Sequence, residues 1–303
     1  MTTTATGLPD GLTHRPLSVA DATAVYELMA AEQQQTLGRV EIEEADIVAD
    51  WSRPSHDLAA VSVGVLDGER LLGYAEVIGQ NRGDAAVHPD RHGQGIGTWL
   101  AHWMQDRARS LGHEETGVPV PAGSPGEALM TSLGYHLRWT TWILAMPSGR
   151  ELVDQPLPAG HTIGIAQTES ERRAVHDVVE DAFLEWADRD KDSFEDWIAQ
   201  VVNRPGFEPW NLRTVLDPAG EVVAGLQVFL SADTAFVSRL AVRRDRRGQG
   251  LARALLTDGF RAAREHGASR SELSTDSRTG ALDLYLALGM EVTDTWVNLG
   301  IRL

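Results

Sequence analysis

The residues best suited to chemistry lie in the segment Val242 to Arg253, which reads VRRDRRGQGLAR. Within it, Gly248 and Gly250 follow an apolar strand-like run and precede a helix-like run, so they stand where a helix begins. A helix start presents unpaired N–H groups, and glycine lets an anion approach them closely. Four arginines share the turn in a chain of formal net charge −17: Arg243, Arg244, Arg246 and Arg247. The segment is therefore predicted to bind a polyphosphate.

The spacing within this turn is more specific than glycine richness. Arg247, Gly250 and Ala252 follow the order Arg/Gln-x-x-Gly-x-Gly/Ala. This is the pyrophosphate-binding pattern of the GNAT superfamily of N-acetyltransferases, which the chain resembles here. A dinucleotide-binding turn needs a small residue where Arg253 stands, and a Walker turn needs a Gly-Lys-Ser/Thr that is missing. An ordinary strand-to-helix turn with a solvated basic rim is the alternative.

The resemblance implies a site for acetyl-CoA (coenzyme A) around this turn. It also implies that the pantetheine arm lies between the parting fourth and fifth strands, against the backbone near Leu240 to Val242. The cofactor-binding residues expected on this basis are Leu240, Ala241, Val242, Arg247, Gly248, Gln249, Gly250, Leu251, Ala252 and Arg253.

A second copy of the pattern occurs earlier in the chain, at Val87 to Gly97 (VHPDRHGQGIG). Gly95 precedes Gly250, and Gly134 precedes Gly289, by the same 155 residues (250 − 95 and 289 − 134). A shared offset of this length indicates two related domains rather than a short-period repeat. The second cofactor site that this copy suggests comprises Val87, His92, Gly93, Gln94, Gly95, Gly97 and Thr98.

The two copies differ where the chemistry would occur. In the resembled family a tyrosine shortly before a Leu-Gly on the last helix commonly protonates the coenzyme A sulfur, and Tyr285 has that position. Its alternative role is core packing. The first copy has Met130 there and His92 in place of Arg247, so it offers no such proton donor and less charge. The first domain is therefore predicted to be catalytically degenerate, either binding coenzyme A or serving as a scaffold.

The general base is the least defined group. The strand FVSRLAV before the second glycine turn contains no carboxylate. Glu272 on the next strand is the candidate, acting directly or through water, and its alternative is a surface strand residue. Relatives without an evident base also exist.

Acceptor specificity is expected from the first helices of the second domain. Carboxylates and aromatic rings together can hold an ammonium group by ion pairing and cation–π contact. A solvated helix face is the competing interpretation. The candidate acceptor-binding residues are Phe183, Glu185, Trp186 and Trp210.

The order of the elements predicts an α/β (α+β) fold with two tandem GNAT-like domains. Each is expected to be a mixed, mostly antiparallel sheet flanked by helices. The expected boundaries are residues 1–148 for the N-terminal domain, 149–159 for a linker rich in proline and glycine, and 160–303 for the C-terminal domain.

Composition excludes several classes of protein. The chain has no cysteine, which removes disulfides, thiolate metal sites and a cysteine nucleophile. Its acidity argues against nucleic-acid and anionic-membrane binding. No metal site is expected from ten scattered histidines. No signal peptide or membrane-spanning run is found, which predicts a cytoplasmic protein, either a monomer or a homodimer.

The leading hypothesis is an acetyl-CoA-dependent N-acetyltransferase that acts on a small primary amine by direct transfer in a ternary complex. A cationic acceptor would suit the acidic surface. The rivals are a noncatalytic acyl-CoA-binding or sensor protein, and an acyltransferase that uses another acyl group or an alcohol acceptor.

Overall fold

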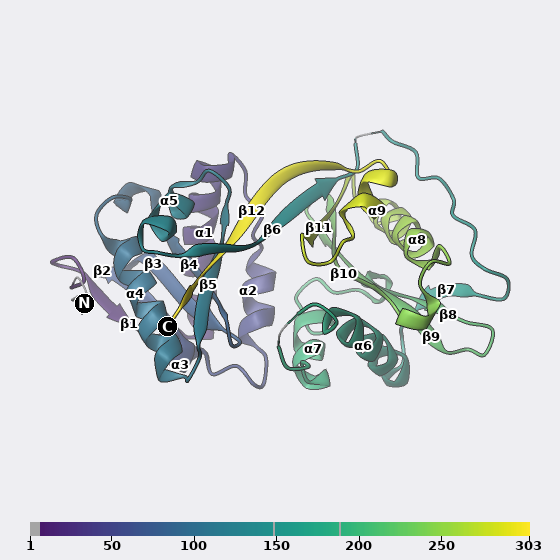
Figure 1. Cartoon of the computed structure of the whole chain (residues 1–303), viewed down its shortest axis with the longest axis horizontal. Coiled ribbons are helices and arrows are strands. Elements are labelled where there is room, and N and C mark those ends of the chain that lie inside the picture. The colour runs from purple at the N-terminus through teal and green to yellow at the C-terminus, as the bar shows by residue number, and fades with distance from the viewer. Residues whose placement is uncertain (1–6, 148, 188) are drawn as a thin grey trace. The chain divides into compact units, whose positions relative to one another are not determined.

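The computed structural model describes residues 7–147, 149–187 and 189–303 (Figure 1). The chain divides into two compact units. The first runs as far as Thr141 and also contains Thr295–Leu303, and the second is Trp142–Asp294. Each is a mixed α/β structure with a mainly antiparallel sheet and flanking helices, as predicted.

The first unit contains a four-stranded antiparallel sheet in the order β1-β2-β3-β4. The strands of the whole unit are β1 (Thr13–Arg15), β2 (Ser62–Asp67), β3 (Arg70–Ile78), β4 (Arg82–Val87) and β5 (Glu115–Pro121), with part of β6 (His136–Ala145) and of β12 (Glu291–Arg302). Its helices are α1 (Ala22–Leu37), α2 (Glu44–Trp51), α3 (Leu58–Val61), α4 (Ile96–Ser110) and α5 (Pro125–Ser132).

The last strand of the chain completes the first unit. Trp296–Arg302 of β12 pair antiparallel with β5. Val297 and Leu299 are buried in the same hydrophobic core as Leu100 of α4. The units therefore differ from the expected ranges, because burial of these side chains places residues 295–303 with the first unit. The alternating pattern of β12 indicates a strand, but it does not identify the partner strand.

The second unit has the strand order β6-β11-β10-β9-β8-β7. Its own strands are β7 (Thr162–Ile165), β8 (Leu212–Leu216), β9 (Val222–Ser231), β10 (Thr234–Val242) and β11 (Arg270–Asp276). Its helices are α6 (Glu169–Phe183), α7 (Phe194–Val201), α8 (Leu251–Glu265) and α9 (Leu282–Ala287).

Local sequence explains where these helices begin. Thr168 and Glu171 form a capping box at α6, and the Ser193 hydroxyl accepts a hydrogen bond from the Asp196 N–H at α7. One face of α8, including Leu255 and Phe260, is fully buried in the core of the unit. In the part of the chain described here, no helix is both long enough and apolar enough to cross a membrane.

Candidate active site

The two glycine turns share one backbone geometry. Gly93 and Gly95 have φ values of 72° and 89°, and Gly248 and Gly250 have φ values of 75° and 83°. Residues with a side chain rarely adopt these left-handed values. Gly95 is the N-cap of α4 and Gly250 is the N-cap of α8. Because a glycine cap has no side-chain oxygen, it leaves the first helical N–H groups to an anion.

His92 and Arg247 occupy corresponding places in these turns. The Nε2 atom of His92 lies 3.0 Å from the carbonyl oxygen of Val87. The Nε atom of Arg247 donates to the carbonyl oxygen of Val242 at 3.1 Å. The Nε2 atom of His92 therefore takes the place of the Nε atom of Arg247. The first turn has no counterpart of the two terminal guanidinium nitrogens, Nη1 and Nη2.

In the second unit, the Nη1 and Nη2 atoms of Arg247 form an ion pair. Arg247 donates from Nη1 and Nη2 to the two carboxylate oxygens of Glu185, at 2.8 and 2.7 Å. The hydrogen bonds from Arg247 lower the pKa of Glu185. Glu185, expected to bind the acceptor, therefore lies against the predicted diphosphate-binding arginine. A diphosphate would have to replace it there.

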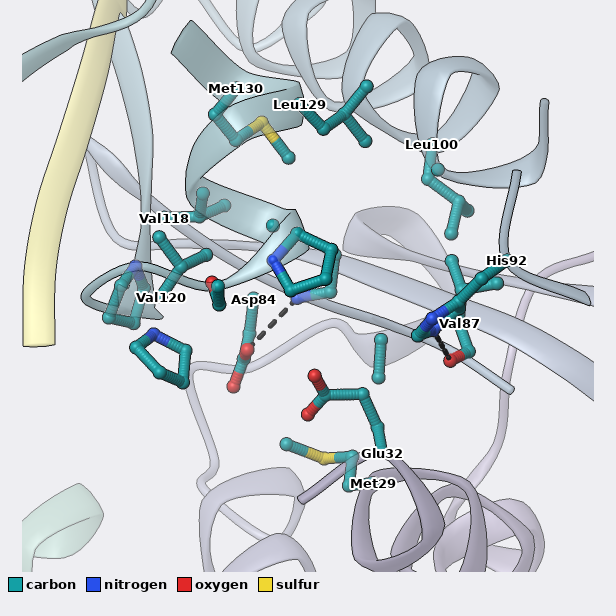
Figure 2. Close-up of a pocket in the computed structure, with 18 of the residues that line it drawn as sticks. Met29, Glu32, Asp84, Val87, His92, Leu100, Val118, Val120, Leu129 and Met130 are labelled. Carbon is teal, nitrogen blue, oxygen red and sulfur yellow. Dashed lines mark hydrogen bonds between the residues drawn. The ribbon is translucent and has the colours of Figure 1, made fainter. Parts of the chain in front are cut away.

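A cavity of about 520 Å³ lies in the first unit (Figure 2). Its wall is formed by α1, β4, the first glycine turn, the start of α4, β5 and α5. The residues of the expected second cofactor site that line it are Val87, His92, Gly93, Gly95, Gly97 and Thr98. Gln94 does not line it, because its amide donates to the Asp90 carbonyl at 3.2 Å instead.

Several features of this cavity are those of a small-molecule binding site. Its size falls within the range usual for small-molecule sites, roughly 300–1,000 Å³. The glycine turn lies at one part of its wall, where it would hold a diphosphate. Strands β4 and β5 border it without being hydrogen-bonded neighbours, which leaves backbone edges for an extended chain. Gly97 allows α4 to pack closely on α5, since a Cβ atom there would lie 2.9 Å from Leu129.

A similar divergence of strands occurs in the second unit. β10 and β11 are parallel and are paired from Thr234 to Val237 of β10. β10 then continues to Val242, paired only with β9 over Leu240 to Val242 among the described residues. The backbone edge of these residues that faces away from β9 is thus available to a pantetheine arm. The resemblance predicts that a pantetheine arm binds at this edge.

Tyr285 lies on α9 with its side chain almost fully buried in the core of the second unit. Burial raises the pKa of its hydroxyl to about 12. The group therefore stays protonated at neutral pH, as a proton donor must. Its counterpart Met130 is also buried and lines the cavity of the first unit.

Glu272 is buried on β11, but its charge is already paired. The Nη2 atom of Arg270 donates to its Oε1 atom at 2.5 Å. Removing a proton from an acceptor would require this carboxylate to leave the guanidinium group. The geometry therefore gives Glu272 little support as a general base.

The expected acceptor-binding aromatic residues do not gather in one place. Phe183 and Trp186 contact each other, with ring centroids 5.2 Å apart, and Arg278 lies over the Trp186 ring. Trp210 stacks on His266 at the C-terminal end of α8, whereas Gly250 caps its N-terminal end. A helix of 15 residues is about 22 Å long, so Trp210 lies far from the glycine turn.

Sequence analysis missed two carboxylates of the first unit, Glu32 on α1 and Asp84 on β4. Both line the cavity, and Figure 2 shows them pointing toward each other across it. The internal repeat of the sequence could have indicated Asp84. The strand before the second glycine turn contains no carboxylate, whereas the corresponding strand of the first copy, RGDAAV, contains Asp84.

The fold and the paired turns define a tandem α/β protein with a glycine-capped helix start in each unit. The model of the acetyltransferase (GNAT) family matches residues 23–126 and 172–290. The chain belongs to this family and is an acetyltransferase enzyme of a class that uses acyl-CoA.

Known proteins are similar to this chain over most of its length. A mycothiol acetyltransferase of Saccharopolyspora erythraea is 28% identical over 251 residues, covering 77% of this chain and 82% of the relative. A GCN5-related N-acetyltransferase of Sphaerobacter thermophilus has a TM-score of 0.75 at 26% identity, covering 98% and 97% of the two chains. A tandem GNAT protein from the clavulanic acid biosynthesis pathway shares the fold, with a TM-score of 0.74 at 19% identity over 96% and 98%.

Proposed function

We propose that this enzyme transfers the acetyl group of acetyl-CoA to a small primary amine, by direct attack of the amine nitrogen in a ternary complex. The observation that carries the proposal is the glycine-capped helix start beside an open strand edge, which suits a carrier with a diphosphate and an extended arm. The chain has no cysteine to form an acyl-enzyme thioester.

In the second unit we assign the roles as follows. The N–H groups after Gly248 and the guanidinium group of Arg247 hold the diphosphate, and the backbone of Leu240 to Val242 binds the pantetheine arm. Tyr285 donates a proton to the departing sulfur. Its raised pKa supports this role, because the hydroxyl keeps its proton until a strong base develops nearby.

The test is a thiol-release assay with acetyl-CoA and a panel of primary amines that includes the acceptor of the mycothiol acetyltransferase reaction. We expect release of coenzyme A that depends on an amine, with the acetylated amine confirmed by mass spectrometry. Binding of acetyl-CoA without turnover by any acceptor would instead indicate a sensor protein. Turnover with alcohols alone would indicate an acyltransferase with an alcohol acceptor. A preference for longer acyl chains would indicate a donor other than acetyl-CoA.

The variant Tyr285→Phe tests the proton donor. We expect thiol release to fall by at least roughly 10-fold with the best amine, since general acid catalysis contributes about 10²–10⁴-fold at one site. The matched control is Tyr26→Phe, which removes the hydroxyl of a half-buried residue on α1, outside both glycine turns. An unaltered rate in Tyr285→Phe would contradict the assignment.

A further inference from the structure

Two carboxylates face each other across the sheet of the first unit. Glu76 on β3 and Asp84 on β4 are directly opposed in the antiparallel register. Side chains at such positions share a face of the sheet, with Cβ atoms about 4.5–5.5 Å apart. Two negative charges at this separation repel, so their surroundings decide which carboxylate stays ionised.

The surroundings of Glu76 stabilise its charge. Trp51 Nε1 and Tyr74 Oη donate to its Oε2 atom at 2.9 and 2.7 Å, and His56 Nε2 lies 2.9 Å from Oε1. Burial alone would raise the pKa of Glu76, but His56 and Tyr74 outweigh it and lower the pKa below its usual value. Glu76 is therefore a fixed negative charge.

The surroundings of Asp84 have the opposite effect. Burial raises the pKa of Asp84 to about 6. The positive charge of Arg82 opposes this rise, and the negative charges of Glu76 and Asp50 add to it. Its Oδ1 atom accepts a hydrogen bond from the Ala85 N–H at 2.9 Å. Its Oδ2 atom has no hydrogen-bond partner among the described residues, and the side chain faces the cavity (Figure 2).

A carboxylate with a lowered pKa beside one with a raised pKa is typical of acid–base catalytic sites. When their surroundings push two pKa values apart, the carboxyl that titrates near neutral pH can exchange a proton during turnover. Asp84 is mainly ionised at pH 7 and is still basic enough to accept a proton. Glu32, on the opposite side of the cavity, adds a second negative charge that favours a cationic ligand.

We propose that the cavity of the first unit is a second acyl-transfer site, in which Asp84 is the general base for a cationic primary amine. The inference rests on the proposed function only in taking a coenzyme A thioester as the donor. It replaces the expectation that the first domain is catalytically degenerate, which was based on His92 and Met130.

The proton and electron balance of the step is complete without Tyr285. The Asp84 carboxylate takes one proton from the ammonium group, and the neutral nitrogen forms a bond to the acyl carbonyl carbon. The carbon–sulfur bond breaks, and its electron pair leaves with the sulfur. A second proton from the nitrogen passes to the sulfur through solvent, because Met130 has none to give. Asp84 then returns its proton to water.

The experiment uses the full chain with Tyr285→Phe, which disables the proposed donor of the second unit. We expect the remaining amine-dependent thiol release to rise with pH through about 6, as Asp84 loses its proton. Adding Asp84→Asn is expected to reduce this remaining rate by roughly 10²-fold or more and to remove that pH dependence. The matched control is Asp106→Asn, an exposed carboxylate on α4.

A second measurement does not depend on turnover. The carboxyl carbon-13 resonance of Asp84, assigned by its loss in Asp84→Asn, is expected to titrate near pH 6. Addition of a small primary amine, such as the best one in the assay, should shift that midpoint downward, because a bound cation favours the carboxylate.

The outcomes separate this inference from the proposed function. No amine-dependent turnover in the unmodified chain would contradict the proposed function and the second site alike. Turnover in the unmodified chain that is abolished by Tyr285→Phe alone, or a remaining rate that Asp84→Asn leaves unchanged, would overturn the second site only. A titration of Asp84 near its ordinary value, with no response to an amine, would also overturn it.

Discussion

Arg247, Glu272 and Asp84 differ in what already neutralises their charge. Arg247 is paired with Glu185, and Glu272 is paired with Arg270. One oxygen of Asp84 binds only a backbone N–H, and the other faces the cavity. The positive charge of Arg82 acts on Asp84, but no ion pair between the two is found among the described residues, so Asp84 is better placed for chemistry than Glu272.

Replacement of Glu185 by glutamine should tighten coenzyme A binding to the second unit. The ion pair with Arg247 is partly exposed, and pairs of this kind contribute up to about 1 kcal/mol. Releasing Arg247 should therefore increase affinity by up to about fivefold. Calorimetric titration fitted to two classes of site measures the change, with the exposed Glu195→Gln on α7 as the control. Weaker binding in Glu185→Gln would show that the carboxylate assists the site.

Asp84→Asn should stabilise the fold at neutral pH. The pKa of Asp84 in the folded chain, about 6, exceeds its ordinary value of 3.8, so ionisation opposes folding as the pH rises between these values. A shift of about two pKa units corresponds to about 3 kcal/mol. We expect the variant's advantage in the free energy of unfolding to grow by roughly 2.4 kcal/mol between pH 4 and 7. A difference that does not change with pH would contradict the assignment.

The glycine caps of α4 and α8 matter at the scale of the element. Each helix starts at a residue with positive φ, and this geometry leaves the first helical N–H groups able to bind an anion. In the second unit the glycine turn follows the end of β10 at Val242, after the pairing of β10 with β11 has ended at Val237. The proposed acyl-CoA site of the second unit depends on both features.

Gly250→Ala should impair both stability and binding. Alanine in a left-handed conformation costs roughly 1–2 kcal/mol, and relaxation of that strain would misdirect the N–H groups of α8. The control is Gly267→Ala, which has a positive φ of 104° at the other end of α8 and open space around it. We expect both variants to lower the melting temperature, and only Gly250→Ala to weaken coenzyme A binding. Equal effects of the two variants on coenzyme A binding would contradict a diphosphate site at the N-terminal end of α8.

At the scale of the whole molecule, the last strand joins the two halves of the sequence. β12 begins in the second unit and ends in the core of the first. Its pairing with β5 places Trp296 in the wall of the cavity. The first unit therefore depends on residues that follow the entire second unit in the sequence.

Leu299→Ala should destabilise the first unit selectively. The side chain is 3% exposed within that core, and removal of a buried leucine costs about 2–5 kcal/mol. Hydrogen exchange should become faster for the amides of β5 than for those of β10. Leu286→Ala, at a side chain 44% exposed, is the control. Equal loss of protection in both units would show that they unfold together.

The sequence by itself determined the two glycine turns, the tandem repeat and the class of enzyme. These features depend on residues close together in the chain, namely a strand, a bend with glycines at fixed spacing and an amphipathic helix. Local conformational preference is sufficient to define them.

Only the tertiary structure decided the rest. The opposition of Glu76 and Asp84 depends on strand register, and the pairing of Glu272 with Arg270 and of Arg247 with Glu185 depends on side-chain orientation. The insertion of β12 into the first unit joins residues about 180 positions apart. Such relations arise because burial of apolar surface selects among many possible pairings, and no short stretch of sequence records that choice.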